Sequence, residues 1–138
     1  MNMEHEGMQG YRRIARQIRT AKNARRDTPP VARSADLPDA LAAGWKGQKT
    51  CELLDEYEQV RVLRCTFSPG VGHERHAHPR GDFGYVLSGG KMQVTDSKGT
   101  EVVEDRAGDY WVSDPIEWHE AVNVGDTTLS YLIVEMKD

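Results

Sequence analysis

The stretch GVGHERHAHPRGDFGYVLSGG, residues 70–90, carries the pattern on which the fold assignment depends. It contains His76 and His78 with one residue between them, and Asp82 follows four residues after the second histidine. Side chains at positions i and i+2 of a β-strand point to the same face, so the two imidazoles are expected to point to one side. Two imidazoles placed in this way can chelate a first-row divalent metal.

The glycines around the histidine pair strengthen this interpretation. A His-x-His pair alone is weak evidence of a metal site, because surface strands carry such pairs by chance. Here Gly70 stands six residues before His76, and Gly89 lies seven residues beyond Asp82. The regular spacing indicates that the pair belongs to a larger motif.

A second stretch, GDYWVSDPIEWHEAVN at residues 108–123, supplies another histidine. His119 comes eleven residues after Gly108, and Asn123 follows four residues later. This histidine lies on a distant strand, so only the fold can bring it to the first pair.

Together the two stretches resemble the two motifs of the cupin superfamily. The first motif reads glycine, five residues, His-x-His, three or four residues, glutamate, six residues, glycine, and the chain departs from it only at Asp82, which replaces the glutamate. The second reads glycine, five residues, proline, x, glycine, two residues, histidine, three residues, asparagine, and its glycine, histidine and asparagine are kept. Its middle differs at three positions: Asp114, Pro115 and Ile116. The resemblance covers roughly residues 55–136.

This resemblance implies an all-β fold, a jelly-roll barrel (double-stranded β-helix) with a mononuclear metal site at its mouth. Carried over by position, His76, His78 and His119 become the nitrogen ligands and Asp82 the oxygen ligand of one divalent transition metal. Asp is one methylene shorter than Glu, so direct ligation, contact through water, and a hydrogen bond to a ligand imidazole all stay open for Asp82. Ligand type does not select among iron, manganese, nickel, copper and zinc.

Beyond the two motifs, the region after about residue 50 predicts some eight short strands separated by glycine turns. The segment 58–67 alternates, with Leu63, Cys65 and Phe67 on one face. Residues 83–87 and 91–95 flank Ser-Gly-Gly, which is typical of a β-hairpin, and a second turn at 97–99 leads into 101–103.

Several residues near the predicted site have two interpretations. Phe67, Val86 and Met92 are expected either to line a substrate pocket or simply to fill the barrel. His73 precedes the histidine pair, and we expect a solvated loop histidine rather than a further ligand. Two cysteines, Cys51 and Cys65, are too few for a disulfide framework, so reduced and buried thiols are expected.

The N-terminal region differs from the rest of the chain in charge. Residues 1–37 carry eight Lys/Arg and four Asp/Glu, whereas residues 38–138 carry ten and eighteen. We therefore predict a basic arm and linker over 1–37 and a barrel domain over 38–138. Residues 11–26 have apolar positions at helical spacing, which indicates either a docked arm or an amphipathic helix that contacts an anionic surface.

The overall composition predicts a soluble, single-domain protein without a nucleic-acid or membrane partner. With 138 residues and a formal net charge of −4, the chain suits one domain and gives no reason to expect nucleic acid as a partner. No apolar run is long enough to span a membrane and no signal-peptide pattern follows the N-terminus, so a cytoplasmic protein is expected. Small barrels of this type commonly pair, which favours a homodimer.

Three functions remain open at this stage. An open site of three imidazoles favours a metal-dependent enzyme acting on a small organic molecule, with an oxygenase ahead of an isomerase or lyase. The first alternative is a non-catalytic cupin that senses a metal or a small ligand. The second is a degenerate cupin that has lost its metal, which the irregular second motif and Asp82 would allow.

Overall fold

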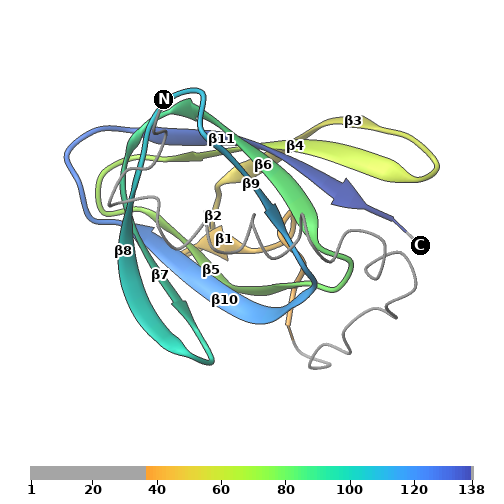
Figure 1. Cartoon of the computed structure of the whole chain (residues 1–138), viewed down its shortest axis with the longest axis horizontal. Helices are drawn as coiled ribbons and strands as arrows, with labels where there is room; N and C mark the ends of the chain where they lie inside the picture. Colours follow the sequence, from red (N-terminus) through yellow and green to blue (C-terminus); the bar gives the residue numbers. More distant parts are fainter. Residues whose placement is uncertain (1–36, 138) are drawn as a thin grey trace, which may run out of the picture.

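The computed structural model describes residues 37–137, which form two β-sheets that face each other (Figure 1). The predicted helical arm over 11–26 lies outside the described residues. Within the described range, no helix is long and apolar enough to cross a membrane. The predicted all-β class is confirmed.

The first sheet has five strands in the order β3-β4-β11-β6-β9, and all neighbours are antiparallel. Its strands, in chain order, are β3 (Cys51–Glu56), β4 (Val60–Phe67), β6 (Asp82–Ser88), β9 (Tyr110–Ser113) and β11 (Leu129–Met136). The last strand, β11, lies at the centre of this sheet, between β4 and β6.

The second sheet has four strands in the order β5-β10-β7-β8, again with antiparallel neighbours. Its strands are β5 (Gly72–His78), β7 (Gly90–Asp96), β8 (Gly99–Asp105) and β10 (Ile116–Asn123). A two-stranded ribbon precedes both sheets and consists of β1 (Gly44–Trp45) and β2 (Gln48–Lys49).

The predicted hairpin around residues 88–90 is wrong, and the predicted turn at 97–99 is confirmed. β6 and β7 do not pair, because β6 lies between β9 and β11 while β7 lies between β8 and β10. The turn at residues 88–90 therefore carries the chain from one sheet to the other (Figure 1). The turn at 97–99 does close a hairpin, since β7 and β8 pair from Gly90↔Asp105 to Asp96↔Gly99.

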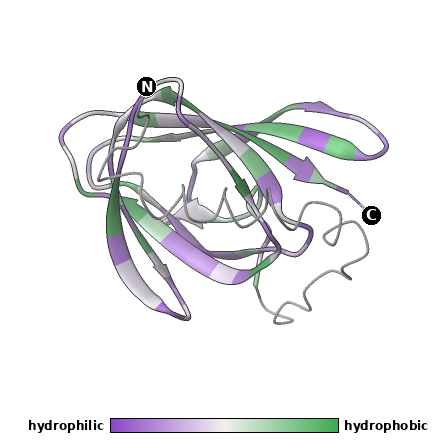
Figure 2. Cartoon of the chain, viewed as in Figure 1, coloured by the Kyte–Doolittle hydropathy of each residue, from purple (hydrophilic) through white to green (hydrophobic). Residues whose placement is uncertain are grey.

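The hydrophobic core lies between the two sheets. Along β4, the buried positions alternate with more exposed ones, so Leu63, Cys65 and Phe67 share the inward face as predicted. The same alternation of apolar and polar residues is visible along the strands in Figure 2. Burial of this face against the opposite sheet is the main favourable term for folding.

The prediction of reduced cysteines is wrong, because Cys51 and Cys65 form a disulfide. The two residues are directly opposite each other on β3 and β4, with their Cα atoms 4.0 Å apart, and both side chains are buried. Cross-strand register, which a count of cysteines does not reveal, brings the two sulfur atoms together.

Candidate metal centre

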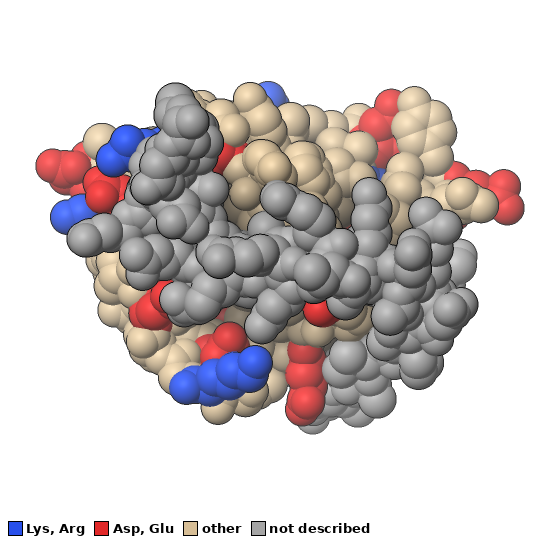
Figure 3. All heavy atoms as spheres, viewed as in Figure 1, with Lys and Arg blue, Asp and Glu red and all other residues tan. Residues whose placement is uncertain are grey.

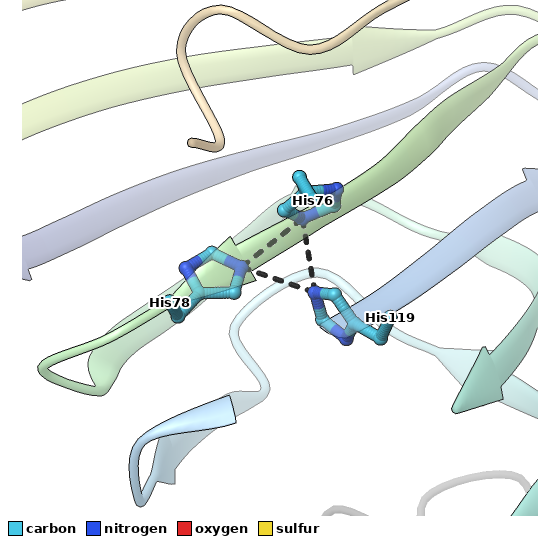
Figure 4. Close-up of side chains that lie close together, drawn as sticks. All are labelled: His76, His78 and His119. Carbon is cyan, nitrogen blue, oxygen red and sulfur yellow. Dashed lines mark hydrogen bonds between the residues drawn. The ribbon is translucent and has the colours of Figure 1, made fainter. Parts of the chain in front are cut away.

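Three histidines from the four-stranded sheet converge on one point (Figure 4). His76 and His78 lie on β5, and His119 lies on the adjacent strand β10, where its Cα partner is His76. The Nε2 atoms of His76 and His78 are 3.1 Å apart, and each lies 3.0 Å from Nε2 of His119. The structure thus brings together the three nitrogen ligands that the sequence predicts.

The local strand geometry explains this convergence. His76 and His78 occupy positions i and i+2, so both point toward the interior between the sheets. Ala77 between them is also buried, because the segment around Pro38 and Asp39 lies against this part of β5. The backbone N–H of Ala77 donates a hydrogen bond to the carbonyl oxygen of Pro38. The β5–β10 register shifts on both sides of His119, so the pairing of the two strands is irregular at this residue.

Hydrogen bonds at the outer ring nitrogens determine which nitrogen of His76 and His78 faces the centre. Nδ1–H of His76 donates to the carbonyl oxygen of Glu74 at 2.6 Å, and Nδ1–H of His78 donates to Oε2 of Glu135 at 2.9 Å. A neutral imidazole has one N–H, so both Nε2 atoms then carry lone pairs. Lone pairs that face each other at 3.1 Å in a buried site repel each other unless a cation lies between them. The donor set therefore fits a metal ion.

The three nitrogens could hold one metal ion together. Their separations of 3.0–3.1 Å are short enough for a single divalent transition metal to be bound by all three. With only three protein ligands, such a metal would keep coordination positions for water or substrate.

The protonation of two of the three rings suits metal ligation. Burial, followed by the proximity of the other histidines, lowers the pKa of His76 and of His119 well below its ordinary value. Burial would also lower the pKa of His78, but the carboxylates of Asp82 and Glu135 outweigh it and raise this pKa. Two of the three rings are thus held in the neutral form that metals bind.

Asp82 does not join the group of three nitrogens. Its Oδ2 lies 3.2 Å from Nδ1 of His78, the outer ring nitrogen, and its Oδ1 accepts a hydrogen bond from Ser113. The carboxylate is buried, but it contacts a ligand imidazole on the side away from the convergence point. Asp82 is thus a charged neighbour of the His78 ring at its outer nitrogen, and its role at the metal centre stays a prediction.

Glu135 and Arg61 belong to the surroundings of the histidines, and the sequence reasoning missed both of them. Glu135 lies on β11 and is buried, and Arg61 on β4 is its Cα partner and donates to its carboxylate. Burial would raise the pKa of Glu135, but the hydrogen bond and charge of His78 and the charge of Arg61 lower it overall. The sequence did contain an indication of Glu135. Side chains of a strand alternate between its faces, and Glu135 falls on the same face as Leu129, Tyr131 and Ile133, so an acid lies on the inward face of an apolar strand.

The prediction of a solvated His73 is wrong. His73 is part of β5, its side chain is buried, and its ring stacks on that of His76 with the centroids 3.8 Å apart. Its Nε2 lies 2.8 Å from the carbonyl oxygen of Ala40 and 3.7 Å from Sγ of Cys51. Burial lowers the pKa of His73 to about 4, so this ring is a neutral packing partner of a ligand.

The three predicted pocket residues lie in the packed core. Phe67, Val86 and Met92 are each at most 2% exposed and belong to the same apolar cluster. Phe67 lies beside His73, with the two ring centroids 5.6 Å apart. This placement matches the second of their two interpretations, in which these side chains fill the barrel.

Comparisons with known proteins agree with this architecture. Residues 63–135, more than half of the chain, match the family model described as Cupin domain. No match was found among curated proteins. Similar solved structures include a cupin domain from Bordetella pertussis Tohama I, with 18% identity and a TM-score of 0.61 over 76% of this chain and 100% of that one.

Two further structures are similar in fold. An uncharacterized conserved protein with a double-stranded β-helix domain from Klebsiella pneumoniae has 23% identity and a TM-score of 0.56, over 75% of this chain and 90% of that one. A cupin superfamily protein from Desulfitobacterium hafniense has 14% identity and a TM-score of 0.53, over 80% of this chain and all of that one. At these identities the likeness establishes the fold alone, and together with the family match it shows that the chain belongs to the cupin family.

Proposed function

We propose that this cupin binds one divalent transition metal through His76, His78 and His119 and acts as a metal-dependent enzyme on a small organic substrate. The observation that carries the proposal is the convergence of three Nε2 atoms within 3.1 Å of one another. The proton positions on His76 and His78 support it, because both Nδ1–H groups are committed to acceptors on the outer side. A closed structural zinc site would be expected to use four ligands, often cysteines.

The surrounding residues define what the chain itself contributes to chemistry. When bound, a divalent transition metal supplies Lewis acidity and, if it is redox-active, a route for electrons to dioxygen. The three imidazoles hold the ion on one side and leave the other side for a substrate. Glu135 and Asp82 hold the proton of His78 at Nδ1, which keeps that ring oriented. An oxygenase is the favoured reaction type, and an isomerase or lyase is second.

Metal analysis of purified protein tests the site directly. The wild-type chain should retain about one equivalent of a divalent transition metal, and His76→Ala and His119→Ala should each lose it. His5→Ala, which removes a histidine outside the trio, is the matched control and should keep the metal. Metal that stays bound in both site variants would contradict the proposed ligand set.

A non-catalytic sensing cupin is the alternative function. The burial of three apolar residues in the core supports this alternative, because these residues were expected to line a pocket. They are Phe67, Val86 and Met92. Oxygen uptake by the iron-loaded protein, measured across a panel of small organic acids, amines and phenols, separates the two. Turnover that is lost in His76→Ala supports the enzyme, whereas ligand-dependent stabilisation without turnover supports the sensor.

The remaining expectations about partners stay predictions. On the face shown in Figure 3, acidic and basic side chains of the described residues are interspersed, which favours small-molecule ligands over nucleic acid. A cytoplasmic location stays a prediction, and the Cys51–Cys65 disulfide argues against it, because disulfides persist mainly in oxidising compartments.

The homodimer also stays a prediction. The outer face of the five-stranded sheet is the surface proposed for it, because Tyr85, Leu87 and Tyr110 are all exposed there.

A further inference from the structure

The outer nitrogen of His78 lies between two buried carboxylates. Nδ1 is 2.9 Å from Oε2 of Glu135 and 3.2 Å from Oδ2 of Asp82. One N–H can make one strong hydrogen bond, so the two acids do not have equal roles. The shorter distance assigns the bond to Glu135.

The carboxylate of Glu135 is fixed at both of its oxygens. Oε2 accepts from His78, while Oε1 accepts from Nε of Arg61 at 2.8 Å and from its Nη2 at 2.7 Å. The side chains of Arg61 and Glu135 are only 17% and 8% exposed. Charge-assisted hydrogen bonds between side chains that are largely shielded from solvent keep their geometry better than the same bonds at an exposed surface.

Arg61 also forms an ion pair with a second carboxylate. Its Nη2 lies 3.0 Å from Oδ2 of Asp39, a residue of the segment that enters the barrel ahead of β1. The same segment contacts β5 directly, through the parallel bridge between Asp39 and Ala77. A continuous chain of ion pairs and hydrogen bonds therefore runs from Asp39 through Arg61 and Glu135 to the ring of His78.

We propose that Glu135 is the positioning residue of the metal centre: it holds His78 with its proton on Nδ1 and its Nε2 toward the ion, and Arg61, anchored on Asp39, fixes Glu135. The inference rests on the metal site proposed above. Asp82 is the weaker partner of the same nitrogen, because its Oδ2 lies 3.2 Å from Nδ1 whereas Oε2 of Glu135 lies 2.9 Å from it. A carboxylate behind a ligand imidazole both orients the ring and makes it a stronger donor to the metal.

Zinc affinity measured by competition with a chromophoric chelator tests this assignment. Glu135→Gln keeps the shape of the side chain and removes its charge, and it should weaken zinc binding by about 10- to 100-fold. Asp82→Asn should weaken it less. Glu120→Gln is the matched control, because Glu120 also pairs with an arginine, Arg75, but at an exposed position on β10. This control should bind zinc as the wild type does.

Nitrogen-resolved NMR of the zinc-loaded protein provides a readout that a purely structural role would not change. In the wild type, the Nδ1–H proton of His78 should be shifted downfield by its carboxylate acceptor. In Glu135→Gln it should move upfield, since an amide oxygen is a weaker acceptor than a carboxylate, while the Nδ1–H proton of His76 stays in place.

Arg61→Lys keeps the proposal testable if Glu135→Gln fails to fold. It should weaken zinc binding in the same direction by a smaller factor, and Arg64→Lys on the same strand, whose ion pair with Glu52 is exposed, is its control. Unchanged zinc affinity in both Glu135→Gln and Arg61→Lys would overturn the inference, as would a His78 signal that moves only in Asp82→Asn. A wild-type chain that binds no zinc would overturn the metal site itself, which is a distinguishable result.

Discussion

Replacement of Asp105 by asparagine should change how the stability of this protein depends on pH. Asp105 lies at the end of β8, is 2% exposed, and accepts a hydrogen bond from the hydroxyl of Tyr131 on β11. Its other carboxylate oxygen, Oδ1, has no hydrogen-bond partner among the described residues. Burial, and to a lesser extent the charge of Asp109, raises the pKa of Asp105 from 3.8 to about 7, although the bond from Tyr131 opposes this.

The sign of the effect follows from proton binding. Between pH 3.8 and about 7 the folded protein holds a proton on Asp105 that the unfolded chain has released, so stability falls as the pH rises through this range. The full difference corresponds to about 4 kcal/mol, of which about 2.5 kcal/mol is lost between pH 5 and pH 8. Asparagine does not titrate, so Asp105→Asn should not show this loss.

Urea unfolding of the wild type and of Asp105→Asn at several pH values between 5 and 8 measures the effect. The free-energy difference between the two proteins should shift in favour of the variant by roughly 2–3 kcal/mol across this range. Other titrating groups, including the histidines, contribute equally to both proteins and cancel. Two parallel stability curves would refute the reasoning and show that Asp105 is ionised throughout.

Three further predictions concern the scaffold and its assembly. Replacing both Cys51 and Cys65 with alanine should lower the free energy of unfolding by about 3 kcal/mol, as expected for a disulfide that closes a loop with a sequence separation of 14, and equal unfolding midpoints would contradict this. Gly84→Ala should cost about 1–3 kcal/mol in thermal unfolding, because a Cβ there would lie 2.1 Å from the ring of Trp111, and an unchanged melting temperature would argue against that packing. Tyr85→Lys should convert the expected homodimer into a monomer in light scattering, and a dimer of unchanged mass would exclude the outer face of the five-stranded sheet.

The metal trio shows what local pattern can predict. The side-chain period of a strand places His76 and His78 on one face whatever the rest of the chain does, and the resemblance to the two cupin motifs pointed to His119 as their partner. The inward face of β4 followed from the same alternation. These features depend on residues that are close in sequence, or on motifs whose spacing is typical of one fold.

Most of the features that were missed or wrong depend on which strands are neighbours. Glu135 reaches His78 because β11 lies at the centre of the opposite sheet, and the missed disulfide depends on the register of β3 against β4. The hairpin expected at residues 88–90 was wrong because the turn signal is the same whether the chain returns to its own sheet or crosses to the other.

The amino-acid sequence by itself thus determined the all-β class and the three histidines, because strand periodicity and motif spacing are local properties of the chain. Only the tertiary structure decided that Asp82 and Glu135 lie behind His78, that His73 is buried against His76, and that the cysteines are joined. The physical reason is that contacts between strands are set by sheet order and register, which arise from packing the whole chain around one core.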